Sequence, residues 1–579
     1  MCGIYAYIGK KRNATSAVFD GLKRLDYRGY DSWGIAVIND HKILLNKHVG
    51  KVNKALLKLP KSSIAIGHTR WATHGAVTDL NAHPHFSSDK SFILAQNGIM
   101  ENHEEIKVNL FKKYYKFISQ TDTEVIVRLI EEESIKAKNI IEAIRKAFNK
   151  LRGRNTIIIL TKDGQVVGVR NGSPLVLGFS KDKTEIYFSS DTLSFAPYVD
   201  QTLTLENGNM AIYSEGKITL KDVVTGKNID LKDEKNKIQK QKVAKGKYKH
   251  FMIKEIYEQP NVIRAVIKQD FTSLKKLATQ IKKSKNVYCI GSGTAGAAAA
   301  QIAFYLRTFG KINAISLIGA EASEYVDLIN KNDLVIAPSQ SGETADVLEF
   351  VEKVKKLKKV KFASYVNMQG SLMSRLSDFK FMANAGPEIC VMSTKVFVSQ
   401  ISWGYLLAKI VEGKYKKGIN NLIKLSQKIN KLLNSKTNIN RLKNLARILS
   451  RQKDIFILGK GQNLQIIKEG MVKIIEGSYI HAHGISAGDL KHYAITLMEK
   501  GVPVIFVISN DEVRDDVINA MNEVKARRAD VYLLEDKEKS ETSAISNIVS
   551  LQLLAYYIAL FKGNDIDKPR NIAKSVTVK

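Results

Sequence analysis

The residue with the clearest chemical potential is Cys2, at the start of the chain. If an aminopeptidase removes Met1, Cys2 carries a thiol and a free α-amine on one residue. An α-amine has a pKa of about 7.7 to 8, so near neutral pH enough of it is unprotonated to accept the thiol proton. The same pairing of nucleophile and base activates an N-terminal threonine. Taken alone, Cys2 also fits an ordinary buried free cysteine.

Five further segments accompany Cys2 within the first 124 residues. Together with Cys2 they resemble the class II glutamine amidotransferase family, in which an N-terminal cysteine hydrolyses glutamine to glutamate and ammonia. The segments are Tyr27-Arg28-Gly29-Tyr30-Asp31-Ser32, His68-Thr69-Arg70-Trp71-Ala72-Thr73-His74-Gly75, Asn81-Ala82-His83-Pro84, Gln96-Asn97-Gly98-Ile99 and Thr121-Asp122-Thr123-Glu124.

This resemblance implies a set of roles in the first half of the chain. Cys2 attacks the glutamine amide, while Asn97 and the Gly98 N–H match the oxyanion hole. Arg70 matches the group that holds the glutamine carboxylate, and Asp122 the group that holds its amine. The remaining implied residues are Thr73, His74 and Gly98, which line the pocket, and Trp71, which matches the gate of an ammonia channel.

A second candidate site follows the predicted strand Asp333 to Ala337. The segment Ser339-Gln340-Ser341-Gly342-Glu343-Thr344 precedes a helix that we expect to begin near Ala345. Hydroxyls and backbone N–H groups at a helix N-terminus suit a phosphate, although Ser341 as a simple helix cap is an equally good interpretation. No Gly-Lys-Ser/Thr follows, which disfavours a nucleoside triphosphate. The segment resembles the phosphosugar loop of the sugar isomerase (SIS) family, which implies phosphate contacts by Ser339, Gln340, Ser341, Thr344 and, from an earlier glycine loop, Thr294.

The predicted helix from Gln465 to Gly477 carries Glu469, Lys473 and Glu476 at spacings that place them on one face. On spacing alone, a solvated Glu-Lys pair explains them as well. Beyond the helix, His481-Ala482-His483 offers two imidazoles. Since no third ligand lies in register with them, we predict no metal.

This helix and three other segments resemble the glutamine:fructose-6-phosphate aminotransferase family, over nearly the whole chain. In that family Lys574 matches a Schiff-base lysine, His492 a ring-opening group supplied by a neighbouring subunit, and Glu476 the base that moves a proton between C1 and C2. Lys473 matches a neighbour that tunes this base. No metal or organic cofactor is implied. The other segments are Met392-Ser393-Thr394-Lys395, Leu490-Lys491-His492 and the tail Lys568 to Lys579.

Three departures from the family pattern surround the proposed sugar site. Tyr493-Ala494 replaces the usual Gly-Pro after Lys-His, His483 stands where an acidic residue often follows His-Ala, and Pro338 precedes the phosphate loop. They leave open a related enzyme or deglycase that acts on another phosphosugar. A catalytically silent phosphosugar sensor is a further alternative, but it predicts a DNA-binding module that we do not find.

Two kinds of sheet are needed to position these groups. Short β-type runs and the hairpin signal Asp163-Gly164 predict an α+β domain over residues 1–230, an Ntn-hydrolase-type αββα sandwich by family resemblance. The second half alternates apolar runs with helical patterns, which predicts parallel, doubly wound α/β sheets. It also repeats: the run ending at Gly291 recurs at Gly459, 168 residues later. The expected parts are the glutaminase domain 1–230, a linker 231–250, SIS domains 251–425 and 426–569, and a catalytic tail 570–579.

Composition narrows the class of protein. The chain has 579 residues, of which 44% are hydrophobic, and three scattered cysteines, too few for a disulfide framework. The net charge of +33 is spread along the chain among acidic residues, so we interpret it as a lysine bias rather than as a nucleic-acid interface. We expect a cytoplasmic homodimer or larger homo-oligomer, without a membrane or nucleic-acid partner, whose substrates are glutamine and fructose 6-phosphate and whose products are D-glucosamine 6-phosphate and glutamate.

Overall fold

The computed structural model describes residues 2–52, 57–230 and 244–576. Contacts divide the chain into two compact units, residues 1–242 with 573–579, and residues 243–572. Met1 and most of the predicted linker 231–250 lie outside the described residues. The proposed boundary at 425/426 falls inside a continuous helix, α12 (Tyr415–Asn434). Both predicted SIS domains lie within one compact unit, and their division at this position stays a proposal.

The first unit contains two seven-stranded sheets with antiparallel pairing. In spatial order, the first sheet contains β11 (Gln201–Thr204), β9 (Val176–Phe179), β10 (Ile186–Ser189), β1 (Gly3–Ile8), β4 (Ile64–Arg70), β2 (Ser32–Asn39) and β3 (Lys42–Val49). The second contains β14 (Asn228–Ile229), β13 (Lys217–Asp222), β12 (Asn209–Ser214), β8 (Val166–Asn171), β7 (Asn155–Thr161), β6 (Phe92–Gly98) and β5 (His85–Phe86).

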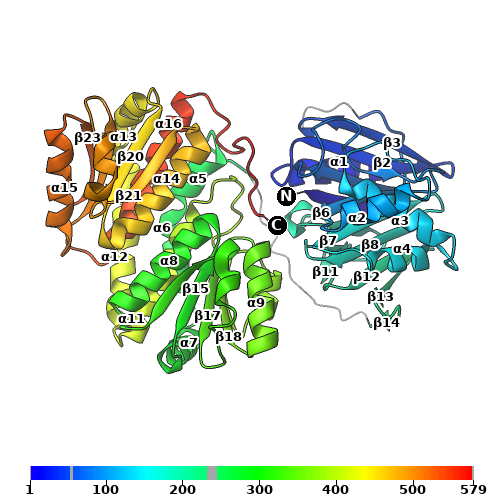
Figure 1. Ribbon diagram of the computed structural model, residues 1–579, viewed down its shortest axis with the longest axis horizontal. Coiled ribbons are helices and arrows are strands. Elements are labelled where there is room, and N and C mark those ends of the chain that lie inside the picture. Colours follow the sequence, from blue (N-terminus) through cyan, green and yellow to red (C-terminus); the bar gives the residue numbers. More distant parts are fainter. Residues whose placement is uncertain (1, 53–56, 231–243, 577–579) are drawn as a thin grey trace. The chain divides into compact units, whose positions relative to one another are not determined.

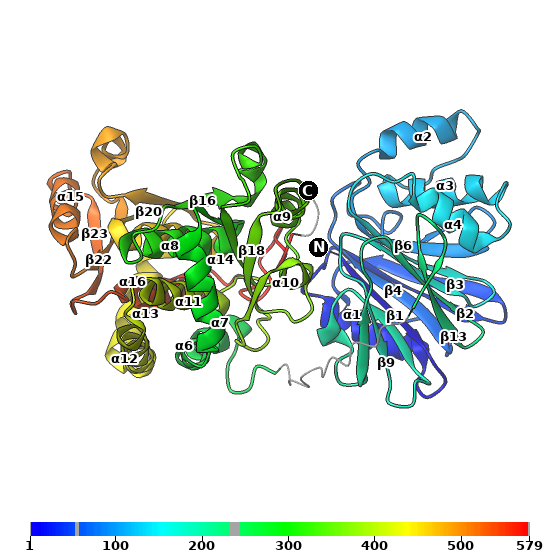
Figure 2. The same cartoon turned by 90° about the horizontal axis from the view of Figure 1, so that it is seen from below.

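Alternation along the strands explains the layers of this unit. In β1, Ile4 and Ala6 face the core between the two sheets, whereas Tyr5 and Tyr7 face α1 (Ala14–Leu25) on the outside. The outer face of the second sheet packs against α3 (Asp122–Ser134) and α4 (Ile140–Phe148). Figure 2 shows α2 (His103–Phe111), α3 and α4 together on that side. The arrangement confirms the predicted αββα sandwich.

The hairpin predicted at Asp163-Gly164 is also confirmed. β7 and β8 pair antiparallel on either side of it, and Gly164 has a φ of +82°, a value that glycine adopts without strain.

The second unit contains two parallel sheets, drawn from green to orange in Figure 1. The first contains β16 (Ala314–Ile318), β15 (Val287–Gly291), β17 (Leu334–Ser339), β18 (Lys361–Val366) and β19 (Phe379–Met382); the second contains β21 (His481–Ser486), β20 (Asp454–Gly459), β22 (Pro503–Ser509) and β23 (Asp530–Asp536). The helices are α5 (Phe251–Tyr257), α6 (Gln259–Ile267), α7 (Phe271–Lys283), α8 (Gly293–Thr308), α9 (Ala345–Lys358), α10 (Leu372–Leu376), α11 (Lys395–Val411), α12, α13 (Lys436–Leu449), α14 (Leu464–Ser478), α15 (Arg514–Ala526) and α16 (Ser543–Phe561).

The central strands β15, β17, β20 and β22 are covered on both faces, which is why they are nearly continuous apolar runs. In β15, Val287 and Cys289 join a core that includes α8 and α11, whereas Tyr288 and Ile290 pack toward α9. The second sheet repeats this scheme with α14 and α16 on one face and α15 on the other. The duplicated α/β architecture is therefore confirmed.

The strand order locates the ligand-binding edge of each sheet. β15 lies between β16 and β17, and β20 lies between β21 and β22. In this doubly wound strand order, ligands bind at the carboxyl ends of the strands, beside the switch point where the order reverses. The switch point of the first sheet lies between the loops that follow β15 and β17. Thr294, in the first turn of α8, and Ser339, the last residue of β17, flank these loops.

The uncharged stretch 287–306 forms β15 and most of α8. In the described part of the chain, one helix, α16, is long and apolar enough to cross a membrane, and 89% of its apolar window is buried within the protein. That burial fits a core helix.

Candidate functional site

Cys2 directly precedes β1 and is half-buried beside the end of β4. The Trp71 N–H donates to the Cys2 sulfur at 3.4 Å, and the thiol donates to the Trp71 carbonyl at 3.6 Å. Burial raises the pKa of the Cys2 thiol, and the Trp71 N–H opposes this shift. Because only the thiolate is a strong nucleophile, this cysteine needs a base to act near neutral pH.

A neighbouring loop holds the end of β4 against Cys2. Asp31 accepts a hydrogen bond from the Ala72 N–H at 2.8 Å, and its own N–H donates to the Arg70 carbonyl at 3.0 Å. A Cβ on Gly29 would lie 2.7 Å from the Arg70 carbonyl carbon, so only glycine permits this approach. The sequence motif contains these residues, but the sequence analysis gave Asp31 no role.

Asn97 and Gly98 end β6 close to the first residues of β1. Ser190 makes the connection: its hydroxyl accepts from the Ile4 N–H at 2.6 Å and from the Asn97 side-chain amide at 3.2 Å. Gly98 has a φ of +145°, and a Cβ there would overlap the Arg154 carbonyl oxygen. Sequence reasoning missed Ser190, for which no local signal exists.

The predicted glutamine-binding residues occupy two segments. The Arg70 guanidinium donates to the carbonyls of His74 at 2.5 Å and Ala76 at 3.2 Å, which shapes the loop that also contains Thr73. Asp122 is buried at the first turn of α3, where it accepts from the Met100 N–H at 2.8 Å. Their contacts with glutamine remain predictions.

In the second unit, the serine-rich loop joins β17 to α9 at the carboxyl end of the sheet. Ser339 accepts from the Gly342 N–H at 2.8 Å, and Ser341 accepts from the Glu343 N–H at 3.1 Å. Thr344, not Ser341, occupies the N-cap position of α9, and its side chain makes no capping hydrogen bond. The interpretation of Ser341 as a simple helix cap is therefore wrong.

Helix α14 presents the predicted acid-base group as a buried charge cluster. Glu469 and Lys473 are fully buried, and the Lys473 ammonium lies 3.3 Å from Glu469 and 2.5 Å from Glu476. Thr294, on α8, accepts from Lys473 and donates to Glu469, each at 3.1 Å. The solvated-pair interpretation is wrong for Glu469 and Lys473, since neither side chain reaches water.

Burial and charge set the protonation of this cluster. Burial raises the pKa of Glu469 to about 7, although Lys473 opposes it. Burial alone would lower the pKa of Lys473, but Glu469 and Glu476 outweigh it and the net shift is upward. The cluster therefore holds a permanent ammonium beside a carboxylate that titrates near neutral pH, as general acid-base chemistry requires.

His492 lies on a separate element of the second unit from the α14 cluster. His492 ends a short exposed 3-10 helix, η5 (Leu490–His492), and its side chain makes no hydrogen bond or ion pair with any described residue. Lys574 belongs to the short tail segment that groups with the first unit. Within the second unit, the tail leaves from Arg570, whose N–H donates to the Tyr479 hydroxyl at 2.9 Å, one residue beyond α14.

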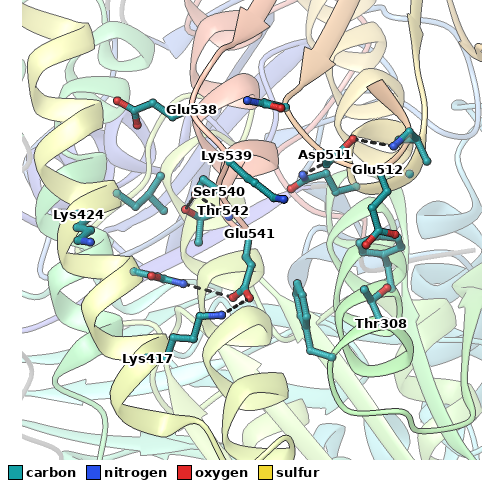
Figure 3. Close-up of a pocket in the computed structure, with 18 of the residues that line it drawn as sticks. Thr308, Lys417, Lys424, Asp511, Glu512, Glu538, Lys539, Ser540, Glu541 and Thr542 are labelled. Carbon is teal, nitrogen blue, oxygen red and sulfur yellow. Dashed lines mark hydrogen bonds and ion pairs between the residues drawn. The ribbon is translucent and has the colours of Figure 1, made fainter. Parts of the chain in front are cut away.

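The second sheet has a cavity of about 900 Å³ where the loops after β20 and β22 meet α8 and α12 (Figure 3). Its lining includes Asn510 to Val513, the counterpart of the serine-rich loop, but none of Glu469, Lys473 or Glu476. Acidic and basic side chains at its edge pair with each other, as Lys417 does with Glu541 at 2.7 Å. The cavity is therefore separate from the α14 cluster.

One expectation about metals is corrected. Asp454 on β20 pairs in register with His481 on β21, so a third ligand does lie beside the two histidines. Sequence spacing missed it because the partner strand begins 27 residues earlier.

Comparisons with known proteins match both halves. A glutamine amidotransferase domain model matches residues 50–249, and an SIS domain model matches residues 280–410 and 448–552. Isomerizing glutamine–fructose-6-phosphate aminotransferases from Thermococcus kodakarensis and Pyrococcus horikoshii are 37% and 36% identical to the chain, with full coverage of both sequences. The chain belongs to the glutamine–fructose-6-phosphate aminotransferase family.

A solved structure supports the same family for the second unit. The C-terminal domain of glucosamine-fructose-6-phosphate aminotransferase from Francisella tularensis is 29% identical, with a TM-score of 0.51, and the match covers 57% of this chain and all of that domain. In this aminotransferase family member, the α14 cluster lies within the second SIS match, whereas Cys2 precedes the amidotransferase match and is covered by the full-length relatives.

We expect Gly98→Ala to destabilise the first unit and to lower glutaminase activity. Strain at a positive φ costs about 1–3 kcal/mol, and displacing an oxyanion donor typically lowers kcat by about 10² to 10³. The matched control is Gly208→Ala, also at positive φ (+82°) but with open space around the new Cβ. Urea unfolding and glutamine hydrolysis measure the two effects. Equal losses of activity in both variants would contradict the role given to Gly98.

We expect the stability of the second unit to depend on the protonation of Glu469. Its pKa of about 7 lies above the ordinary value, so the native state binds the extra proton and the unfolding free energy falls as pH rises from about 4.5 through 7. The slope is at most about 1.4 kcal/mol per pH unit. Glu469→Gln removes this slope, as urea titrations followed by Trp403 fluorescence in a Trp33→Phe, Trp71→Phe background would measure.

The control for this experiment is Asp270→Asn at the N-cap of α7. Hydrogen bonds from Ser273 lower the pKa of Asp270, so its contribution is lost only below about pH 4 and stays constant from 4.5 to 7. A slope that is the same in wild type and in Glu469→Gln would show that Glu469 does not titrate in this range.

Proposed function

We propose that the chain hydrolyses glutamine in its first unit and uses the released ammonia to convert fructose 6-phosphate to D-glucosamine 6-phosphate, with glutamate as the other product. One observation carries the proposal: a half-buried N-terminal cysteine and a buried Glu-Lys-Glu cluster occur on one chain that matches aminotransferases of this name from end to end. Either centre alone would support only half of the reaction.

In the glutaminase step, the Cys2 thiolate attacks the amide carbon and ammonia leaves from the tetrahedral intermediate. Asn97 and the Gly98 N–H are proposed to hold the oxyanion. Water then releases glutamate from the thioester. Since the Cys2 thiol pKa is raised by burial, its proton needs an acceptor, and the free α-amine of Cys2 serves once Met1 is removed.

In the sugar step, the serine-rich loop after β17 is proposed to hold the phosphate, with Ser339, Gln340, Ser341 and Thr344 as contacts. The Lys574 amine condenses with the C2 ketone, and ammonia replaces it. Glu476 then moves a proton between C1 and C2. The Glu476 carboxylate is suited to this step because Lys473 holds it at 2.5 Å and so fixes its position.

Thr294 has a different support. Its hydroxyl is hydrogen-bonded to Glu469 and Lys473. We therefore propose that Thr294 couples phosphate binding to the acid-base cluster, in addition to acting as a phosphate ligand. Thr294 reaches the cluster from α8, the helix that follows β15 of the first sheet.

We propose that the active form is a homo-oligomer in which His492 serves a neighbouring subunit. The support is its exposure at the end of η5, without a partner among the described residues of its own chain. Trp71 is proposed to gate a passage for ammonia, which is reactive only while unprotonated and therefore needs protection from bulk water.

A related phosphosugar is the second candidate substrate. Tyr493, which follows His492 in place of the family's glycine, is 57% exposed. Tyr493 is adjacent in sequence to the residue that is proposed to open the sugar. Comparing turnover of fructose 6-phosphate with that of other ketose phosphates tests this candidate.

We expect substitutions to separate the two half-reactions. Cys2→Ala abolishes both glutamate and glucosamine 6-phosphate formation, because no ammonia is released. Glu476→Gln abolishes the amino sugar but retains glutamate release, measured with fructose 6-phosphate present. Cys289→Ala, a buried cysteine in β15, is the control that retains both. Amino-sugar synthesis by Cys2→Ala with glutamine as the nitrogen source would refute the proposed function.

A further inference from the structure

One corner of the second sheet in the second unit gathers two imidazoles and a carboxylate. In the parallel register, Asp454 pairs with His481 and Phe456 with His483. Since side chains alternate along a strand, these four residues point to the same face of β20 and β21. The arrangement is independent of the α14 cluster and of the serine-rich loop.

This corner is open to solvent. Ile455 and Ile457 point to the opposite, buried face, whereas Phe456 joins the apolar cluster beneath α15. The side chains of His481 and Asp454, at the first positions of their strands, are 69% and 55% exposed. An ion from solution therefore reaches them without any opening of the fold.

The three polar side chains converge on one point. Asp454, His481 and His483 each offer one ligand atom, and these atoms all lie within 4.8 Å of one another. The His481 Nδ1 lies 3.0 Å from an Asp454 oxygen. Zinc binds nitrogen and oxygen ligands at about 2.0–2.2 Å in tetrahedral geometry, so two ligands on one ion lie about 3.3–3.6 Å apart. Rotation of the exposed imidazole brings the ligand atoms toward that separation.

Packing already orders one of the two imidazoles. The His483 ring stacks on Phe456, with centroids 5.1 Å apart and an interplanar angle of 15°. The His481 ring lies edge-on to the His483 ring at 4.3 Å. A ring held in place by the protein loses less rotational freedom on binding, which favours coordination.

We propose that Asp454, His481 and His483 form a binding site for a divalent transition-metal ion. Two imidazole nitrogens and one carboxylate oxygen suit zinc, nickel, copper or ferrous iron, whereas magnesium prefers oxygen ligands alone. Water completes the coordination sphere, because three protein ligands leave at least one position open.

The location sets what the ion does. Asp454 and His481 begin β20 and β21, at the amino ends of the strands, whereas the candidate sugar site lies at the carboxyl ends in the other sheet. The ion therefore joins the first residues of an edge strand to those of its neighbour and stabilises the second unit. It takes no part in the proposed sugar chemistry, so this inference does not depend on the proposed function.

The test is zinc binding by the untagged, full-length chain, stripped with a chelator and carrying Cys2→Ala so that the thiol does not compete for the metal. Isothermal titration with Zn²⁺ is expected to show one site that is weakened at least about 10- to 100-fold by His483→Ala, since loss of even an outer-shell partner has an effect of that size. Zinc at a concentration that saturates the parent chain is expected to raise the unfolding temperature of that chain but not that of His483→Ala.

The matched control is His48→Ala, which removes an exposed imidazole that lies 3.3 Å from Asp79. It is expected to bind zinc like the parent chain. Asp454→Asn preserves the size of the side chain and one acceptor oxygen but removes its charge, and it is expected to weaken zinc binding. This variant guards against a folding defect in His483→Ala. Zinc affinity that is unchanged in both His483→Ala and Asp454→Asn, or a parent chain that binds no zinc, would overturn the proposal.

Discussion

A central constraint on the second unit is the neutralisation of the buried Lys473 ammonium group. Lys473 is fully buried, and an isolated charge there would cost several kcal/mol. Glu469 and Glu476, one turn before and one turn after it on α14, provide that compensation, and Thr294 satisfies a further hydrogen bond from α8. The cluster therefore forms only when α14 of the second repeat packs on α8 of the first.

This constraint links the fold to the proposed chemistry. Two carboxylates beside one ammonium leave one negative charge in excess, and burial raises the pKa of Glu469 until it titrates near neutral pH. A site that holds protons in this way is suited to moving one between adjacent carbons. The duplication supplies the geometry: the first repeat carries the serine-rich loop, and the second carries the acid-base helix.

Local patterns predicted the elements better than they predicted the contacts. The Asp163-Gly164 hairpin follows from a turn dipeptide, the duplication from the recurrence of the Gly291 run at Gly459, and the helix around Lys473 from helical spacing. The structure confirms all three. Contacts between distant strands left no such signal. Ser190, which joins Ile4 to Asn97, and Asp454, which joins the two histidines, come from strand pairing that no local spacing encodes.

The candidate site shows the same division. Cys2 and the segments around Arg70 and Asn97 were found because their residue types recur in a known family pattern. The contacts of Arg70 were not predicted, because its guanidinium donates hydrogen bonds to carbonyls of its own loop. Likewise, the burial of Glu469 and Lys473 depends on which face of α14 meets α8, and helical spacing cannot distinguish that face from a solvated one.

The central claim is that nitrogen passes from glutamine to the sugar without entering bulk water. Its most direct test is mass spectrometry of the amino sugar formed from fructose 6-phosphate and amide-¹⁵N-glutamine in a large excess of unlabelled ammonium. The account predicts glucosamine 6-phosphate that retains nearly all of the label. Product labelled in proportion to the bulk ammonium pool, or no amino sugar at all from mature chain with an exposed Cys2, would contradict it.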